Sequence, residues 1–327
     1  MVIKGAKQIK TLMLRRNLYL ICTAYLLFVT CAEILTIYEP KAGIALHAVI
    51  LFTLLLHSGM ESDKDKNLST FLMALVLAPL IRILSLSMPL AHFSRISWFL
   101  LISIPIFIAI FTCMWVQELR PKDVGLSLPN LRHTPIEAGV ILLAIPFGII
   151  EYQILKPIPL PGLEVTSFIT FSLIFIICTG FVEEFVFRGV IQYNAVRLTE
   201  LRASYRAAVH AKRVEIGRLG AYTRLYKRAE ARLDVVAMRC YSTKIARQRE
   251  IIARKARRKW WGIIFVATIF GVLHVGNLSP WHLDCVLAFS VGFLYSVVRE
   301  KTGSIYGISI SHGIMNILLF LVAPLYF

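Results

Sequence analysis

Acidic residues are scarce in this chain, and its cysteines show no pairing pattern. Asp and Glu number 19 against 36 Lys and Arg, which gives a formal net charge of +17. The six cysteines are scattered and include no Cys-x-x-Cys pair, so the sequence offers no disulfide framework. We interpret them as small buried hydrophobic residues.

Two signatures of hydrolytic enzymes are also missing. No His-Glu-x-x-His occurs in the sequence, and this is the pattern by which many zinc peptidases hold their metal. No Gly-x-Ser-x-Gly occurs either. Ser309 and Ser311 lie close to a histidine but lack the context of a nucleophile elbow, so serine chemistry is unsupported.

Long hydrophobic runs are what the sequence has in abundance. Hydrophobic residues make up 57% of the 327 residues, whereas soluble domains contain about 45–50%. With roughly 20 residues per span, we predict an all-α polytopic integral membrane protein with about nine transmembrane helices and a cytoplasmic helical insert. The predicted spans lie near 17–37, 43–60, 68–90, 97–117, 136–155, 168–195, 259–276, 281–299 and 304–325.

Basic residues set the predicted orientation of these spans. The first run is too long for the hydrophobic region of a signal peptide, so we interpret it as a retained helix. Lysines and arginines before it place the N-terminus in the cytoplasm by the positive-inside rule. Alternating spans then make four segments cytoplasmic, and all four contain Lys or Arg: 61–67, 118–135, 196–258 and 300–303.

Most of the net charge lies in one insert, 197–258. From 197 to 259, 19 Lys and Arg oppose 5 Asp and Glu, a difference of +14. The composition favours helix, and we predict two helices that meet near 217–220 or 240–244. We expect the insert to rest against anionic lipid headgroups. Docking of a protein partner or an acidic substrate tail is the alternative, and nucleic acid is disfavoured because no recognition motif accompanies the charge.

Ionisable and amide side chains occur inside three of the predicted spans. A charged side chain at the centre of a bilayer helix costs roughly 2.5–3.5 kcal/mol even on the lenient insertion scale, so such residues call for an explanation. Carboxylate, imidazole and amide groups in a low dielectric are also the components of a hydrolytic site. The residues are Glu183, Glu184 and Arg188 in the first span, His274 in the second, and His312 and Asn316 in the third.

The adjacent glutamates are expected to have different roles. Neighbouring residues on a helix point about 100° apart, so only one of the two carboxylates can face a given pocket. Glu184 and Arg188 are four residues apart and form an i,i+4 ion pair on one face. Glu183 has no local cation, and a carboxylate in a dry pocket suits a general base. We therefore assign Glu183 to chemistry and the Glu184–Arg188 pair to support; a purely architectural polar network is the alternative.

Depth along the helices allows these groups to meet. At 1.5 Å per residue, Glu183 and His274 lie roughly 21 and 22 Å from the cytoplasmic ends of their spans. His312 and Asn316 lie roughly 12 and 18 Å from theirs. Most of the groups can therefore converge near the middle of the bilayer.

The three motifs together resemble those of the CAAX protease and bacteriocin-processing (CPBP, Abi or Rce-type) family of intramembrane proteases. The family pattern is Glu-Glu-x-x-x-Arg, then Phe-x-x-x-His, then His-x-x-x-Asn/Asp, and all three parts are matched in this order, the second by Phe270 and His274. The resemblance covers about 136–325. It implies that Glu183 and His274 activate water and that His312 and Asn316 stabilise the oxyanion, with Phe270 in support.

The resemblance also bears on the domain organisation, the substrate and the location of the protein. It implies a catalytic core over 136–327, interrupted by the insert at 197–258, which departs from the family's shorter connection. The N-terminal membrane helices predicted over 1–135 lie outside the resemblance. The expected substrate is a membrane-associated peptide or protein. From the family's range and the absence of an organelle signal, we expect a prokaryotic plasma membrane.

Three alternatives stay open. The family has also been described as metallopeptidases, and Glu183, His274 and His312 supply the three ligands that a catalytic zinc needs. We prefer a glutamate-activated water without a cofactor, because it explains the same residues. A transporter would use the enclosed ionisable residues as a proton relay, but no inverted repeat is visible. A non-catalytic membrane scaffold would recruit partners through the insert.

Overall fold

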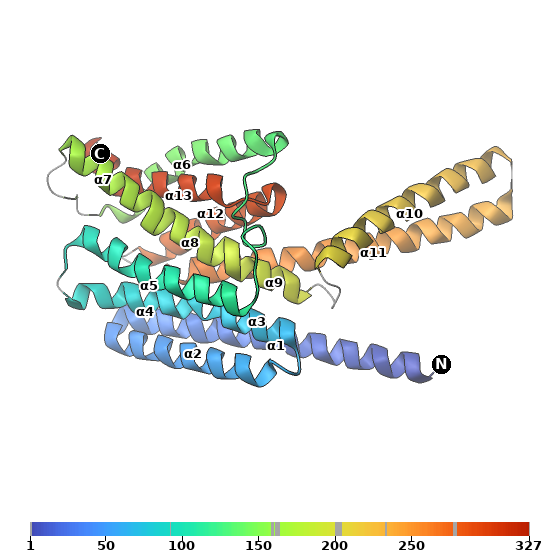
Figure 1. Cartoon of the computed structure of the whole chain (residues 1–327), viewed down its shortest axis with the longest axis horizontal. Coiled ribbons are helices and arrows are strands. Elements are labelled where there is room, and N and C mark those ends of the chain that lie inside the picture. The colour runs from blue at the N-terminus through green and yellow to red at the C-terminus, as the bar shows by residue number, and fades with distance from the viewer. Residues whose placement is uncertain are drawn as a thin grey trace. The chain divides into compact units, whose positions relative to one another are not determined.

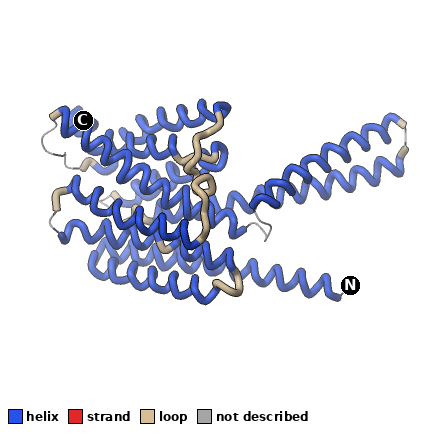
Figure 2. The backbone as a smooth tube through the Cα atoms, viewed as in Figure 1, coloured by secondary structure: helices blue, strands red, loops and turns tan. Residues whose placement is uncertain are grey.

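The computed structural model describes residues 2–91, 93–157, 160, 164–199, 205–232, 234–276 and 280–326. Helices and loops account for all of these residues, and none of them lies in a strand (Figure 2). The all-α prediction is thereby confirmed. The chain divides into two compact units, one comprising Met1–Asn194 with Phe265–Phe327 and the other comprising Ala195–Ile264.

Within the described residues, eight segments are long and apolar enough to cross a membrane, which agrees with a polytopic protein of about nine helices. The ninth predicted span corresponds to a shorter apolar stretch, Trp260–Val272, because the backbone leaves the helix after Val272. The eight segments are Leu18–Tyr38, Pro40–Glu61, Lys66–Ser87, Arg95–Val116, Leu131–Leu155, Val165–Leu198, His282–Thr302 and Tyr306–Tyr326.

The N-terminal part of the first unit consists of packed helices (Figure 1). The helix α2 packs against α1, α3 and α4, and α5 packs against α4. Pro79 has no N–H to donate to a preceding carbonyl, and the helix is interrupted just before it, at Val76. The bounds are α1 Val2–Tyr38, α2 Pro40–Glu61, α3 Lys66–Leu75, α4 Leu77–Ser87 and α5 Arg95–Val116, with a 3₁₀ turn, η1, at Met88–Ala91.

The C-terminal part of this unit contains helices that carry π-helical turns. The π segments η3 (Phe175–Phe181) and η4 (Phe185–Ile191) enclose α8 (Val182–Glu184), the single turn that carries both glutamates. Such π turns occur frequently at functional sites. The remaining elements are η2 Leu131–His133, α6 Thr134–Leu155, α7 Val165–Ile174, α9 Gln192–Thr199, α12 Trp281–Thr302, α13 Tyr306–Ile317, η5 Leu318–Val322 and α14 Ala323–Tyr326.

The helix α13 lies against both η3 and α6. Two glycines allow its backbone to approach η3 closely: a Cβ atom on Gly180 would lie 2.6 Å from the backbone nitrogen of Gly313. A larger residue at either position would separate the two helices. This contact places the third motif directly beside the first.

The second unit contains a helical hairpin built from α10 (Tyr205–Ala231) and the first part of α11 (Val235–Val272). The Nζ atom of Lys244 on α11 lies 5.7 Å from the ring centroid of Tyr222 on α10. The expected meeting points at 217–220 and 240–244 are wrong, because both lie inside helices. Instead Asp234 begins α11, and its Oδ1 accepts the Ala237 N–H at 2.9 Å, as an N-cap does.

Candidate active site

The adjacent glutamates on α8 have different surroundings. The side chain of Glu183 is 27% exposed, whereas that of Glu184 is 0% exposed. Glu183 lines a cavity, and Glu184 is enclosed by its neighbours. Adjacent helical positions diverge by about 100°, and this divergence gives the two carboxylates separate environments.

Glu184 connects the first motif to the third. Its Oε1 accepts a hydrogen bond from Arg188 Nη1 at 3.0 Å, which is the ion pair expected from the spacing. The same oxygen accepts from His312 Nδ1 at 2.9 Å. No sequence pattern predicts this second bond, because the two residues lie on helices far apart in the chain. Glu184 therefore pairs with Arg188 on its own helical segment and also orients the His312 ring on α13.

Arg188 is fully buried and lies against an aromatic ring. Its Cζ lies 4.1 Å from the ring centroid of Phe270, and its Nε and Nη2 have no hydrogen-bond partner in the part of the chain that is described. A guanidinium at this distance is stabilised by the negative face of the ring. The Phe270 ring also lies 4.9 Å from that of His274 and 6.2 Å from that of His312. Phe270 thus packs among three of the motif side chains.

A cavity of about 200 Å³ brings Glu183 and His274 to one space. Thr179, from the π turn that precedes the glutamates, lines it as well. The N-terminal helices contribute Arg82 of α4 to its wall. The remaining wall is formed by Ile81, Ser85, Phe99, Ile102, Cys178, Val182, Phe187, Phe270 and Leu273.

The ring of His274 is oriented by its own helix. Its Nδ1 lies 2.8 Å from the carbonyl oxygen of Phe270. A carbonyl oxygen only accepts, so Nδ1–H is the donor, and in the neutral ring Nε2 carries the lone pair. This arrangement leaves Nε2 as the atom able to take a proton or to orient a water molecule.

His312 and Asn316 are placed differently on α13. The Nε2 of His312 lies 3.9 Å from Glu183 Oε2, so the imidazole sits between the two glutamates. Asn316 donates through Nδ2 to Thr179 Oγ1 at 2.8 Å. An amide group has two N–H donors, and this bond uses one of them. The structure thus brings His312 to Glu183 and connects Asn316 to a residue of the cavity wall.

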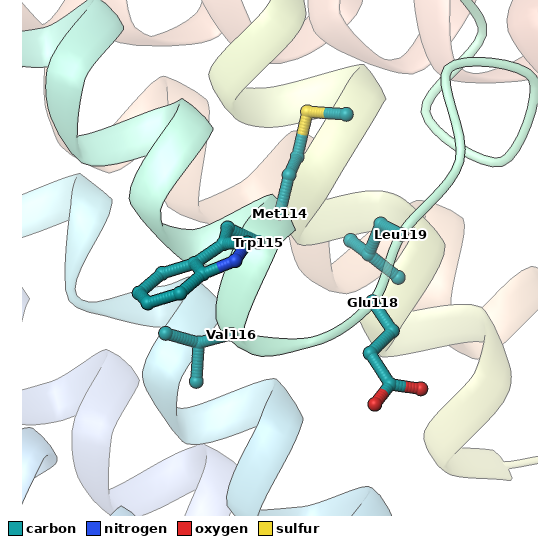
Figure 3. A pocket seen from close by; sticks show the side chains of 5 residues that line it. All are labelled: Met114, Trp115, Val116, Glu118 and Leu119. Atoms are coloured by element: carbon teal, nitrogen blue, oxygen red, sulfur yellow. The ribbon is translucent and has the colours of Figure 1, made fainter.

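A second hollow, of about 570 Å³, lies at the end of α5 (Figure 3). It is lined by Met114, Trp115, Val116, Glu118 and Leu119. Among the described residues that line it, Glu118 is the one ionisable group, and there is no imidazole or second carboxylate. A base without a partner is a poor basis for hydrolysis, so we place the candidate site at the Glu183 cavity.

The residues suggested for zinc do not form a ready site. Among the described residues, no three His, Cys, Asp or Glu side chains are grouped so that they could hold a metal ion. The Nδ1 atoms of His312 and His274 are hydrogen-bonded to Glu184 and to the Phe270 carbonyl, which leaves Nε2 as the available nitrogen of each ring. Glu183, His274 and His312 are therefore not grouped as a ligand set for zinc.

The part of the chain that contains these residues matches a known protein family. Residues 165–318 match the family model described as type II CAAX prenyl endopeptidase, Rce1-like. Neither a curated protein nor a solved structure matches the chain. The matched range runs from α7 to the end of α13 and contains all three motifs, so the resemblance seen in the sequence is confirmed. Residues 165–318 are a domain of the Rce1-like CAAX endopeptidase family.

Proposed function

We propose that this protein is an intramembrane endopeptidase in which Glu183 acts as a general base on a water molecule. The observation that carries the proposal is the division between the two glutamates. Glu184 is fully buried and bonded to Arg188 and His312, whereas Glu183 faces the cavity that also contains His274. The family match supports an endopeptidase, and the eight apolar segments support its location in a membrane.

The proposed reaction begins with water held between Glu183 and His274. Glu183 takes one proton while the oxygen attacks a peptide carbonyl, and Nε2 of His274 orients the same water. The negative charge that develops on the carbonyl oxygen is stabilised by His312 and by the second N–H of Asn316. One such donor is worth about 3–4 kcal/mol of transition-state stabilisation. The proton held by Glu183 then passes to the leaving amine.

The enclosure of the site supports these roles. With Nδ1 bonded to Glu184, His312 donates from Nε2 to an oxyanion only as the imidazolium, and Glu184 supplies counter-charge for that form. Thr179 holds the Asn316 side chain in one position before substrate binds. Donors that are already oriented in a water-poor site need little reorganisation during the reaction.

The experiment is a comparison of new protein termini. Membranes from cells producing the wild type and Glu183→Gln at matched levels would be analysed by mass spectrometry of N-terminal peptides. We expect a set of termini that occurs only with the wild type, and these termini would identify the substrate. Identical sets from two folded, abundant proteins would contradict the proposal and favour a scaffold. Loss of the termini on zinc chelation would contradict the metal-free mechanism.

We further propose that the basic hairpin associates with anionic headgroups, each basic residue contributing about 1 kcal/mol near such a surface. The full chain would be placed in nanodiscs with or without phosphatidylglycerol and treated briefly with trypsin. We expect cleavage within 205–249 to be several-fold slower in the anionic discs, and 0.5 M salt to remove the difference. Equal rates in both lipids at low salt would contradict this partner.

A further inference from the structure

A buried ion pair from the N-terminal helices lies at the candidate site, outside the matched family range. Glu33 on α1 accepts two hydrogen bonds from Arg82 on α4, from Nε at 2.6 Å and from Nη2 at 2.7 Å. His47 Nε2 on α2 lies 3.1 Å from Glu33 Oε1. Glu33 and His47 are 0% exposed. Three separate helices thus converge on one carboxylate.

This carboxylate also holds the chain segment that follows His274. The backbone N–H of Gly276 donates to Glu33 Oε2 at 3.1 Å. Gly276 lies two residues after His274, in the turn that ends α11. Glu33, on α1, therefore holds the backbone of that turn.

The absence of a side chain at position 276 makes this approach possible. A Cβ atom there would lie 2.5 Å from Glu33 Oε2 and 2.8 Å from Arg82 Nη2. Both distances are shorter than real carbon contacts allow, so an alanine would push the turn away from the ion pair. The fit at Gly276 is specific to the Glu33–Arg82 pair, since those two side chains supply the nearest atoms.

Arg82 is part of both the buried ion pair and the wall of the cavity. It pairs with Glu33, and it lines the same cavity as Glu183 and His274. A bidentate carboxylate–guanidinium pair is geometrically rigid. Because breaking a buried pair is strongly unfavourable, the pair is a fixed point against which the turn after α11 can be held.

We propose that Glu33 and Arg82 are positioning residues for His274, so that the N-terminal helices complete a site whose chemical groups all lie in the family domain. The inference rests on the proposed function for its kinetic consequence alone. Its structural part, that the ion pair fixes the turn after His274, is testable without any substrate.

The test is Gly276→Ala, which leaves every charge in place. Hydrogen exchange of the purified full chain would be followed by mass spectrometry. We expect amides in a peptide covering 270–276 to exchange about tenfold faster or more, while those of α13 keep their wild-type rates. Gly139→Ala is the matched control, because a Cβ at that position meets nothing within 4 Å.

Two results would overturn the structural part. Unchanged exchange at 270–276 would show that the pair does not hold the turn, and uniformly faster exchange in all helices would show a general loss of stability. If Gly276→Ala does not accumulate, the double variant Glu33→Gln with Arg82→Met removes both charges together. That variant avoids an unpaired buried ion and is expected to give the same local increase.

The kinetic arm uses an internally quenched peptide spanning a cleavage site found by the terminus comparison. Misplacing a catalytic group by about 1 Å can lower turnover on the order of 10²-fold. We expect Gly276→Ala to lower kcat at least tenfold with KM changed less than about twofold. A change in KM alone would overturn the positioning role. Absence of any cleavable peptide would instead count against the proposed function, while the exchange result would still decide the structural part.

Discussion

Glu183→Gln is expected to lower turnover by about a thousandfold or more, with little change in thermal stability. General base catalysis contributes typically 10²–10⁴-fold, and glutamine cannot accept the proton. The fold should tolerate the change because Glu183 is 27% exposed and the structural bonds of the motif belong to Glu184. Initial rates on a quenched peptide and a melting curve of the purified protein measure the two quantities.

The matched control for this variant is Glu118→Gln. Glu118 is a carboxylate of the second hollow, at the end of α5 (Figure 3). We expect its replacement to leave the rate within about twofold of the wild type. A full rate with Glu183→Gln would refute the base assignment. A large loss with Glu118→Gln would move the site to the second hollow.

Arg188→Ala is expected to destabilise the protein by about 3–5 kcal/mol, the range for removing one partner of a buried ion pair. Glu184 would remain fully enclosed with only His312 to balance its charge. The Phe270 ring would also lose the guanidinium that lies 4.1 Å from its centroid. Yield in membranes and unfolding of the purified protein in denaturant would measure the effect.

A double variant separates charge from packing at this position. Glu184→Gln with Arg188→Met removes both charges and keeps side chains of similar length. Replacing a buried pair by uncharged groups is often neutral or stabilising, so we expect most of the lost stability to return. Normal yield of Arg188→Ala would refute the structural role of the pair. A double variant as unstable as the single one would assign the loss to packing.

Local spacing in the sequence was sufficient to predict the helical class, eight of the spans and the Glu184–Arg188 ion pair. Hydropathy and the i,i+4 relation depend only on residues close together in the sequence, so they do not require knowledge of how the helices pack. The bond between Glu184 and His312 was outside such reasoning, because it depends on how α13 packs against η3. The Glu33–Gly276 bond joins positions even farther apart in the chain and involves a backbone donor that sequence patterns do not distinguish.

The turn of the basic hairpin was predicted at the wrong position for a different reason. Glycines and a polar stretch suggested the turn, yet Gly217 sits inside α10, where a Cβ would meet nothing within 4 Å. Glycine disfavours a helix interior by only about 1 kcal/mol relative to alanine, and the surrounding helix formers outweigh it. Asp234 was the informative residue, since its side chain caps α11. The π turns around the glutamates were not predicted either, because the helical spacing of apolar residues does not distinguish a single π turn from an α turn.

The oxygen of Glu184 that accepts from both Arg188 and His312 has an evolutionary consequence. One atom serves the stability of the first motif and the orientation of a group proposed for catalysis, so mutations at Glu184 or Arg188 are removed by selection even in a descendant that no longer cleaves anything. Glu183 has no such protection. In a lineage that loses activity, the second glutamate and the arginine should persist while the first drifts. An intact Glu184–Arg188 pair therefore reports an inherited fold, and Glu183 is the position at which inherited activity should be judged.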